Sequence, residues 1–253
     1  MTDKLNMDGA ATTSTGQALV TPELKRSAAI DIAQVVSTLL LVKSILVEVE
    51  ALWTYAGPIS LLAAIAVASW RLMQNGENWA DLGLARPQNM KVTLVWTLAA
   101  LVLTMATGVL LEILTSAFAG GGGGDARDAN GGRFADLPGN IYVYLYWLAA
   151  AWIIGGFVEE MLFRGFLITR FERLFARFPF GLVAAVILPA ILFGQSHYYY
   201  QGLNGALATG AVAMVSGILY LLMKRSLWPL TLSHGLSNTI GLTLIYTGVQ
   251  PAG

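Results

Sequence analysis

The chain has 253 residues, of which 56% are hydrophobic and 12% are charged, and its mean hydropathy is +0.63. A soluble domain usually carries about twice that share of charge, so the composition favours a lipid environment. The formal net charge is zero, and no nucleic-acid partner is expected. The absence of cysteine excludes disulfides, thiolate metal ligands and a cysteine nucleophile.

Residues 1–26 are predicted to form a disordered cytoplasmic tail. Its first 23 residues are rich in Thr, Ala, Gly and Asp and have little apolar surface to bury. They contain no continuous apolar run, so a cleaved signal peptide is not expected.

Seven apolar blocks follow the tail, and most are close to the roughly 20 residues that a helix needs to cross a bilayer. They lie at 28–47, 52–70, 92–118, 141–169, 180–198, 203–223 and 227–246. Because a spanning backbone must satisfy its own hydrogen bonds, these blocks predict an all-α polytopic transmembrane bundle with about seven (six to eight) membrane helices. Asp31, Gln34 and Lys43 interrupt the first block, which either spans or lies in the interface as an amphipathic helix.

Basic residues alternate between the connections of these blocks, which predicts the orientation of the chain. They are Lys25 and Arg26, then Arg71, Arg86 and Lys91, then Arg170, Arg173 and Arg177, and finally Lys224 and Arg225. The positive-inside rule then places the protein in the cytoplasmic membrane as a multi-pass protein with a cytoplasmic N terminus and an outer C terminus. The glycine run at 120–124 is predicted to lie in a flexible external loop.

The fourth block carries Glu159, Glu160 and Arg164, although a charge at mid-bilayer costs about 2.5–3.5 kcal/mol on insertion scales. One explanation is structural, since Glu160 and Arg164 stand at i and i+4 and can form an ion pair within the helix. That pair does not account for Glu159. A second acid in the same turn favours a functional site in which one carboxylate is neutralised and the other is active.

Both histidines of the protein, His197 and His234, also lie in apolar blocks. A single such histidine is more often a packing residue than a catalyst, but two of them in membrane blocks favour a polar site. His234 and Asn238 share a helix face at i and i+4, as do Phe193 and His197.

The spacing of these residues relates the blocks to one another. Glu159 and His197 are equidistant from residue 178, beside Pro179, so an antiparallel hairpin there would set them at one depth. His234 is closer to its basic flank than His197 is. His234 can reach the level of Glu159 and His197 if the hairpin projects into the cytoplasm or if a helix breaks near Pro189.

Taken in order, Glu159-Glu160-x-x-x-Arg164, Phe193-x-x-x-His197 and His234-x-x-x-Asn238 resemble the CPBP family of CAAX-processing and bacteriocin-processing intramembrane peptidases. The segment Asp81-Leu82-Gly83-Leu84 is similar to the one that opens the family's domain. The resemblance covers roughly residues 80–247. It divides the chain into N-terminal membrane helices (27–79) and a CPBP-like catalytic membrane domain (80–250).

The resemblance implies hydrolysis of a peptide bond inside the membrane. Glu159 would be the general base, His197 would hold the water, and His234 and Asn238 would stabilise the oxyanion. Glu160 and Arg164 would orient the helix and the peptide, with Phe193 in a supporting place. The expected partners are a peptide or lipidated protein substrate and membrane lipid, whereas the oligomeric state is not predicted.

No cofactor is predicted to be required, because a glutamate and a histidine can activate water by themselves. Zinc stays open as an alternative, with Glu159, His197 and His234 as candidate ligands. The sequence lacks the His-Glu-x-x-His pattern of many zinc peptidases.

Two other functions stay open. The protein could be a non-proteolytic membrane binding or immunity protein that keeps the motifs as a buried polar network. It could also be a small proton-coupled transporter, although no internal symmetry between two halves is visible.

Overall fold

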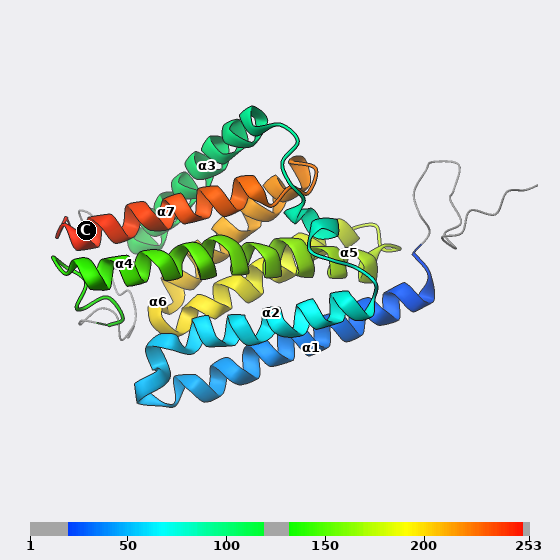
Figure 1. Cartoon of the computed structure of the whole chain (residues 1–253), viewed down its shortest axis with the longest axis horizontal. Coiled ribbons are helices and arrows are strands. Elements are labelled where there is room, and N and C mark those ends of the chain that lie inside the picture. The colour runs from blue at the N-terminus through cyan, green and yellow to red at the C-terminus, as the bar shows by residue number, and fades with distance from the viewer. Residues whose placement is uncertain (1–19, 119–131, 250–253) are drawn as a thin grey trace, which may run out of the picture.

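The computed structural model describes residues 20–118 and 132–249, and these ranges form a bundle of helices in which no strand occurs (Figure 1). The predicted all-α polytopic bundle is confirmed. The expectations for residues 1–19 and for the 120–124 loop lie outside the described residues. The helices are α1 (Pro22–Val47), η1 (Glu50–Tyr55), α2 (Ala56–Gln74), η2 (Ala80–Leu84), α3 (Met90–Phe118), α4 (Ile141–Ala150), η4 (Ala151–Ile168), α5 (Thr169–Phe175), α6 (Gly181–Leu222) and α7 (Trp228–Tyr246).

The first helix starts inside the stretch that was assigned to the disordered tail. Thr21 caps α1, with its side chain accepting a hydrogen bond from the Leu24 backbone N–H at 3.3 Å, and Pro22 occupies the first turn. Both are helix start signals. Residues 22–26 are therefore helical, and the predicted boundary at residue 26 is wrong.

Two of the three polar residues in the first apolar block, Asp31 and Lys43, point into the protein, whereas Gln34 is exposed. Asp31 is fully buried, and its carboxylate accepts from Arg71 Nε at 2.6 Å and from Arg170 Nε at 2.7 Å. Lys43 is also buried. Helix α1 packs along α2 (Figure 1) and is long and apolar enough to cross a membrane. The buried Asp31 thus joins α1 to neighbouring helices of the bundle.

Residues 141–175 form one continuous helical rod from α4 through η4 to α5. In the middle of the rod, η4 is a π-helix, with the wider turn that i→i+5 hydrogen bonding produces. The rod ends at Phe175 and α6 begins at Gly181, which agrees with the hairpin turn predicted beside Pro179.

Helix α6 consists of two legs that meet at Gly202, whose φ of 67° and ψ of −168° are not helical. The legs fold back against each other so closely that a Cβ on Gly194 would lie 2.4 Å from the Ala206 carbonyl oxygen. The two blocks predicted at 180–198 and 203–223 are these two legs, seen in yellow and orange in Figure 1.

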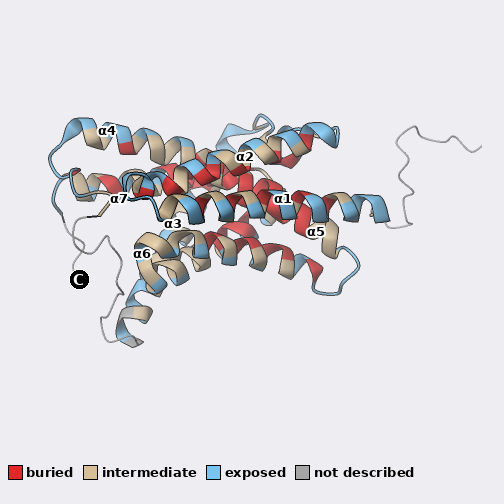
Figure 2. Ribbon diagram, turned by 90° about the horizontal axis from the view of Figure 1, so that it is seen from below, coloured by how far each residue is buried: buried red, intermediate tan, exposed pale blue. Residues whose placement is uncertain are grey.

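In the described ranges, five helices have the length and composition to cross a membrane, and α6 is counted once among them. Buried residues run along the interior of the bundle, whereas outer helix faces are exposed (Figure 2). Helix α3 exposes a row of large apolar residues, among them Val95, Leu98 and Val102. In a membrane protein such a surface faces lipid.

Candidate active site

The glutamate pair stands on η4, which contacts α2, α6 and α7. Glycines allow η4 and α7 to approach closely. A Cβ on Gly155 would lie 2.6 Å from Asn238 Nδ2, and one on Gly156 would lie 3.2 Å from the Thr231 carbonyl oxygen. Small residues of this kind let backbones meet in membrane bundles. They bring Glu159 and Glu160 against α7.

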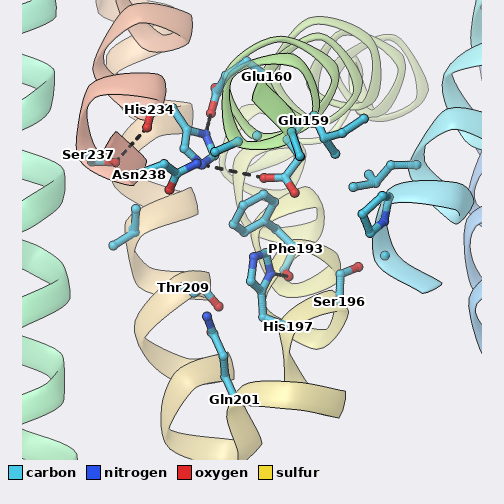
Figure 3. Close-up of a pocket in the computed structure, with 18 of the residues that line it drawn as sticks. Glu159, Glu160, Phe193, Ser196, His197, Gln201, Thr209, His234, Ser237 and Asn238 are labelled. Carbon is cyan, nitrogen blue, oxygen red and sulfur yellow. Dashed lines mark hydrogen bonds and ion pairs between the residues drawn. The ribbon is translucent and has the colours of Figure 1, made fainter. Parts of the chain in front are cut away.

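His234 on α7 lies between the two carboxylates (Figure 3). Its Nδ1 is 2.8 Å from Glu160 Oε1, and its Nε2 is 3.8 Å from Glu159 Oε2. When Glu160 is ionised it can only accept, so Nδ1 carries the proton and donates. This hydrogen bond fixes the imidazole orientation and directs Nε2 toward Glu159.

The ion pair expected within the helix is present. Arg164 Nη1 lies 3.1 Å from Glu160 Oε1, and both side chains are almost fully buried. The guanidinium also stands over the Phe193 ring, 4.8 Å from its centroid. Glu160 is thus held by Arg164 and His234, whereas the ion pairs of the described residues give Glu159 one partner, at longer range. The two neighbouring acids have different environments, as expected for different roles.

His197 reaches the same region from the first leg of α6. Its Nδ1 lies 2.9 Å from the Phe193 carbonyl oxygen. A carbonyl can only accept, so Nδ1 donates, and in a neutral ring Nε2 is left as an acceptor. The register of the hairpin is visible in the edge-to-face contact of Phe163 and Phe193, whose ring centroids are 5.0 Å apart and which are also equidistant from residue 178.

Helix α6 has no break near Pro189, so the level of His234 is explained by the projection of the hairpin beyond the start of α7. Both guanidinium Nη atoms of Arg225 bond Glu172 at 2.7 Å, so the start of α7 is level with α5. The turn after Phe175 lies beyond this level. His234 therefore meets η4 although it lies closer to its basic flank than His197 does.

The predicted site residues line one cavity of about 400 Å³. Its wall includes Glu159, Glu160, Arg164, Phe193, His197, His234 and Asn238. Figure 3 shows the glutamates on one side, with His234 and Asn238 on a neighbouring helix and Phe193 and His197 below them. The structure thus brings together all the residues that the sequence singled out. It also extends the cavity toward the end of the bundle that carries Arg133.

Several further residues of the cavity wall were not predicted as site residues. Lys43 comes from α1, Arg133 from the segment before α4, and Tyr199 and Tyr200 from the end of the first leg of α6. Arg133 Nη2 donates to Tyr199 Oη at 2.7 Å, and its guanidinium lies 4.2 Å from the Tyr200 ring centroid. Their positions depend on how distant helices pack. Only the charge of Lys43 within an apolar block could have drawn attention to it.

The three candidate zinc ligands do not form a metal site in this arrangement. Zinc binds nitrogen and oxygen donors at about 2.0–2.2 Å. Within residues 20–118 and 132–249, no group of three His, Asp or Glu side chains is placed to hold an ion. His234 instead directs its Nδ1 to Glu160.

The fold and the cavity define a polytopic membrane protein with a buried carboxylate–imidazole site between its helices. Residues 141–240 match the family described as type II CAAX prenyl endopeptidase Rce1-like. This match places residues 141–240 in the CPBP family of membrane proteins, of which that family is a part. The matched segment contains all three motifs, whereas the segment 81–84 and helices α1 to α3 lie outside it.

Comparisons with curated proteins and with solved structures found no match. The family match supports a protease that acts on a membrane-associated peptide, and it does not indicate the catalytic type.

Proposed function

We propose that this protein is an intramembrane endopeptidase that hydrolyses a peptide bond near the C terminus of prenylated or other membrane-associated peptides. The observation that carries the proposal is the convergence of Glu159, His197, His234 and Asn238 on one cavity among membrane helices. Peptide hydrolysis needs a base, a held water molecule and oxyanion donors, and these residue types supply all three.

Glu159 is the proposed general base. It takes a proton from a water molecule that also donates a hydrogen bond to Nε2 of His197. The water oxygen attacks the peptide carbonyl carbon, and the carbonyl oxygen becomes an oxyanion. Glu159 then passes the proton to the peptide nitrogen, the C–N bond breaks, and a carboxylic acid and an amine are released, which ionise to a carboxylate and an ammonium group.

The oxyanion is assigned to Asn238 and His234. The Asn238 carboxamide is a donor in its neutral form. Because Nδ1 of His234 faces Glu160, Nε2 can donate only in the imidazolium form, which the two flanking carboxylates would stabilise electrostatically. Glu160 thus orients the ring. Its Oε2 is buried and has no hydrogen-bond partner among the described residues, so it could accept from a substrate N–H.

The test is a cleavage assay with the purified protein in detergent, using synthetic peptides with and without a prenylated cysteine near the C terminus. Each is incubated with and without a chelator, and mass spectrometry locates the cut. We expect cleavage a few residues from the C terminus that the chelator leaves unchanged. Loss of cleavage that only zinc restores would replace the metal-free mechanism. No cleavage of any peptide would favour a binding protein or a transporter.

A further inference from the structure

Lys43 is a charged residue for which neither the fold nor the proposed reaction yet gives a reason. It lies in α1, outside the segment that matches the family, and its relative exposure is 5%. A lysine near the end of a membrane helix usually extends its ammonium group to the interface. Lys43 instead points inward, and its Nζ donates to Gln195 Oε1 of α6 at 3.0 Å.

Unlike the other buried charges, this ammonium group has no counter-ion in the described parts of the chain. Among the other buried charges, Asp31 pairs with Arg71 and Arg170, and Glu160 pairs with Arg164, whereas none of the described ion pairs includes Lys43. Gln195 is neutral and engages one of three ammonium protons. A cation buried without a carboxylate is costly, so an anionic ligand that reached it would be bound strongly.

The position of Lys43 connects it to the catalytic cavity. Its side chain lines the same cavity as Glu159 and His197, and Gln195 precedes His197 by two residues on the same helix. The cavity wall holds two other basic side chains that are already engaged: Arg164, which pairs with Glu160, and Arg133. Arg133 Nη2 donates to the Thr54 carbonyl oxygen at 2.9 Å as well as to a tyrosine hydroxyl. Lys43 is therefore the cation best placed to receive an anion that enters.

We propose that Lys43, held by Gln195, binds the C-terminal carboxylate of the peptide substrate. This assignment rests on the proposed peptidase function and defines its substrate class more closely. A carboxylate fixed at Lys43 would set the distance from the chain end to Glu159, so the enzyme would release a short peptide of constant length. Peptides without a free C terminus would be poor substrates.

The experiment uses one cleaved sequence made in three forms, with a free C-terminal carboxylate, with a C-terminal carboxamide, and as a carboxamide whose last residue is glutamate. The ratio of kcat/KM for acid over amide is measured in the parent and in Lys43→Met, Lys43→Arg and Gln195→Leu. We expect the parent to favour the acid at least tenfold, as close charge pairs do elsewhere. The acid-over-amide ratio should fall to about one in Lys43→Met. It should stay well above one in Lys43→Arg and Gln195→Leu, because both keep a cation at position 43.

A purely structural role for Lys43 would lower cleavage of acid and amide together and keep their ratio, which would overturn the proposal. Equal cleavage of acid and amide by the parent would also overturn it while leaving the peptidase function intact. If the glutamate-ended amide matched the acid, the site would recognise any carboxylate, and the C-terminal assignment would be wrong. If the parent cleaved none of the peptides, the function itself would fail and the subsite with it.

Discussion

At the scale of single residues, the site depends on two adjacent glutamates with different surroundings. Glu160 is bound by Arg164 and His234, whereas the nearest described charged partner of Glu159 is 3.8 Å away. A carboxylate held by two cations is a poor base, because both partners favour its charged form. The less constrained Glu159 is therefore the better candidate to accept a proton from water.

Replacing each glutamate by glutamine should separate the two roles. Glu159→Gln should lower the cleavage rate by at least about 10²-fold and change thermal stability little, because it removes a base and leaves packing intact. Glu160→Gln should lower activity and also the free energy of unfolding, by up to about 3–5 kcal/mol, because it leaves Arg164 unpaired in the interior. Cleavage rates in detergent measure the activity of the two variants, and thermal unfolding in detergent measures their stability. Parental activity in Glu159→Gln would disprove its assignment as the base.

The proposed oxyanion donors should act in the transition state more than in substrate binding. Asn238→Ala and His234→Ala should each lower kcat by about 10²–10³-fold and change KM much less. Thr247→Val is a control on the same helix, since its hydroxyl bonds only within the last turn of α7. A rise in KM with kcat preserved would assign both residues to substrate binding instead.

At the scale of elements, the decisive contact is that between η4 and α7. Gly155 provides the space into which the Asn238 side chain fits, and Gly235 provides the space for the Trp152 ring. The Trp152 indole is held in place by a 3.1 Å hydrogen bond to Thr239. The glycines bring the two motif helices close enough for imidazole and carboxylate to touch.

We expect Gly155→Ala to act through Asn238. The new methyl group would displace the carboxamide, so kcat should fall nearly as far as in Asn238→Ala, while stability is kept because alanine suits a helix better than glycine. The Gly155→Ala/Asn238→Ala double variant should be no slower than Asn238→Ala alone. Gly108→Ala, which makes an ordinary 3.7 Å contact in α3, is the control. Additive losses in the double variant would contradict this coupling.

At the scale of the whole molecule, an ion-pair network joins the N-terminal helices to the helices that carry the site. Arg170, which is fully buried, bonds both Asp31 of α1 and Glu77 after α2, and Arg173 bonds Glu77 as well. These ion pairs thereby connect helices α1 and α2, which lie outside the family match, to α5. This attachment also keeps Lys43 in the wall of the cavity.

Asp31→Asn should destabilise the protein as a whole. It leaves the buried Arg170 with fewer charge partners, and a loss of about 3–5 kcal/mol is expected from the free energy of unfolding. The exposed Arg26→Gln on the same helix should stay within about 0.5 kcal/mol. The melting temperatures of the Asp31→Asn and Arg26→Gln variants, measured by thermal unfolding in detergent, test this difference. Equal melting temperatures would show that the network does not hold α1 in place.

The orientation in the membrane is a prediction of the basic residues, and it decides which face the cavity approaches. Reporter fusions after Arg177 and after Arg225 should be cytoplasmic, and a fusion within 120–133 should be external. The cavity extends toward the Arg133 end, so the same fusions indicate the side from which a substrate would enter. Fusions that all reported one side would contradict the topology.

The sequence by itself determined the helical spans and the chemical composition of the site. A long apolar segment in lipid must be helical, because its backbone has to satisfy its own hydrogen bonds. Burying charge in a membrane is costly, so Glu159, Glu160 and the two histidines stood out as candidate site residues. The equal distances of Glu159 and His197 from residue 178 also predicted that the two lie at one depth. The start of α1 could also have been read from Thr21 and Pro22, but was missed.

Only the tertiary structure decided which groups touch. That His234 bridges the two glutamates depends on the close approach at Gly155 and Gly156, and that Lys43 reaches the cavity depends on its side chain extending from α1 to Gln195 of α6. Such contacts join residues up to 152 positions apart. Sequence periodicity and residue spacing describe one helix or one hairpin at a time. They therefore do not predict how helices that are distant in the sequence pack against each other.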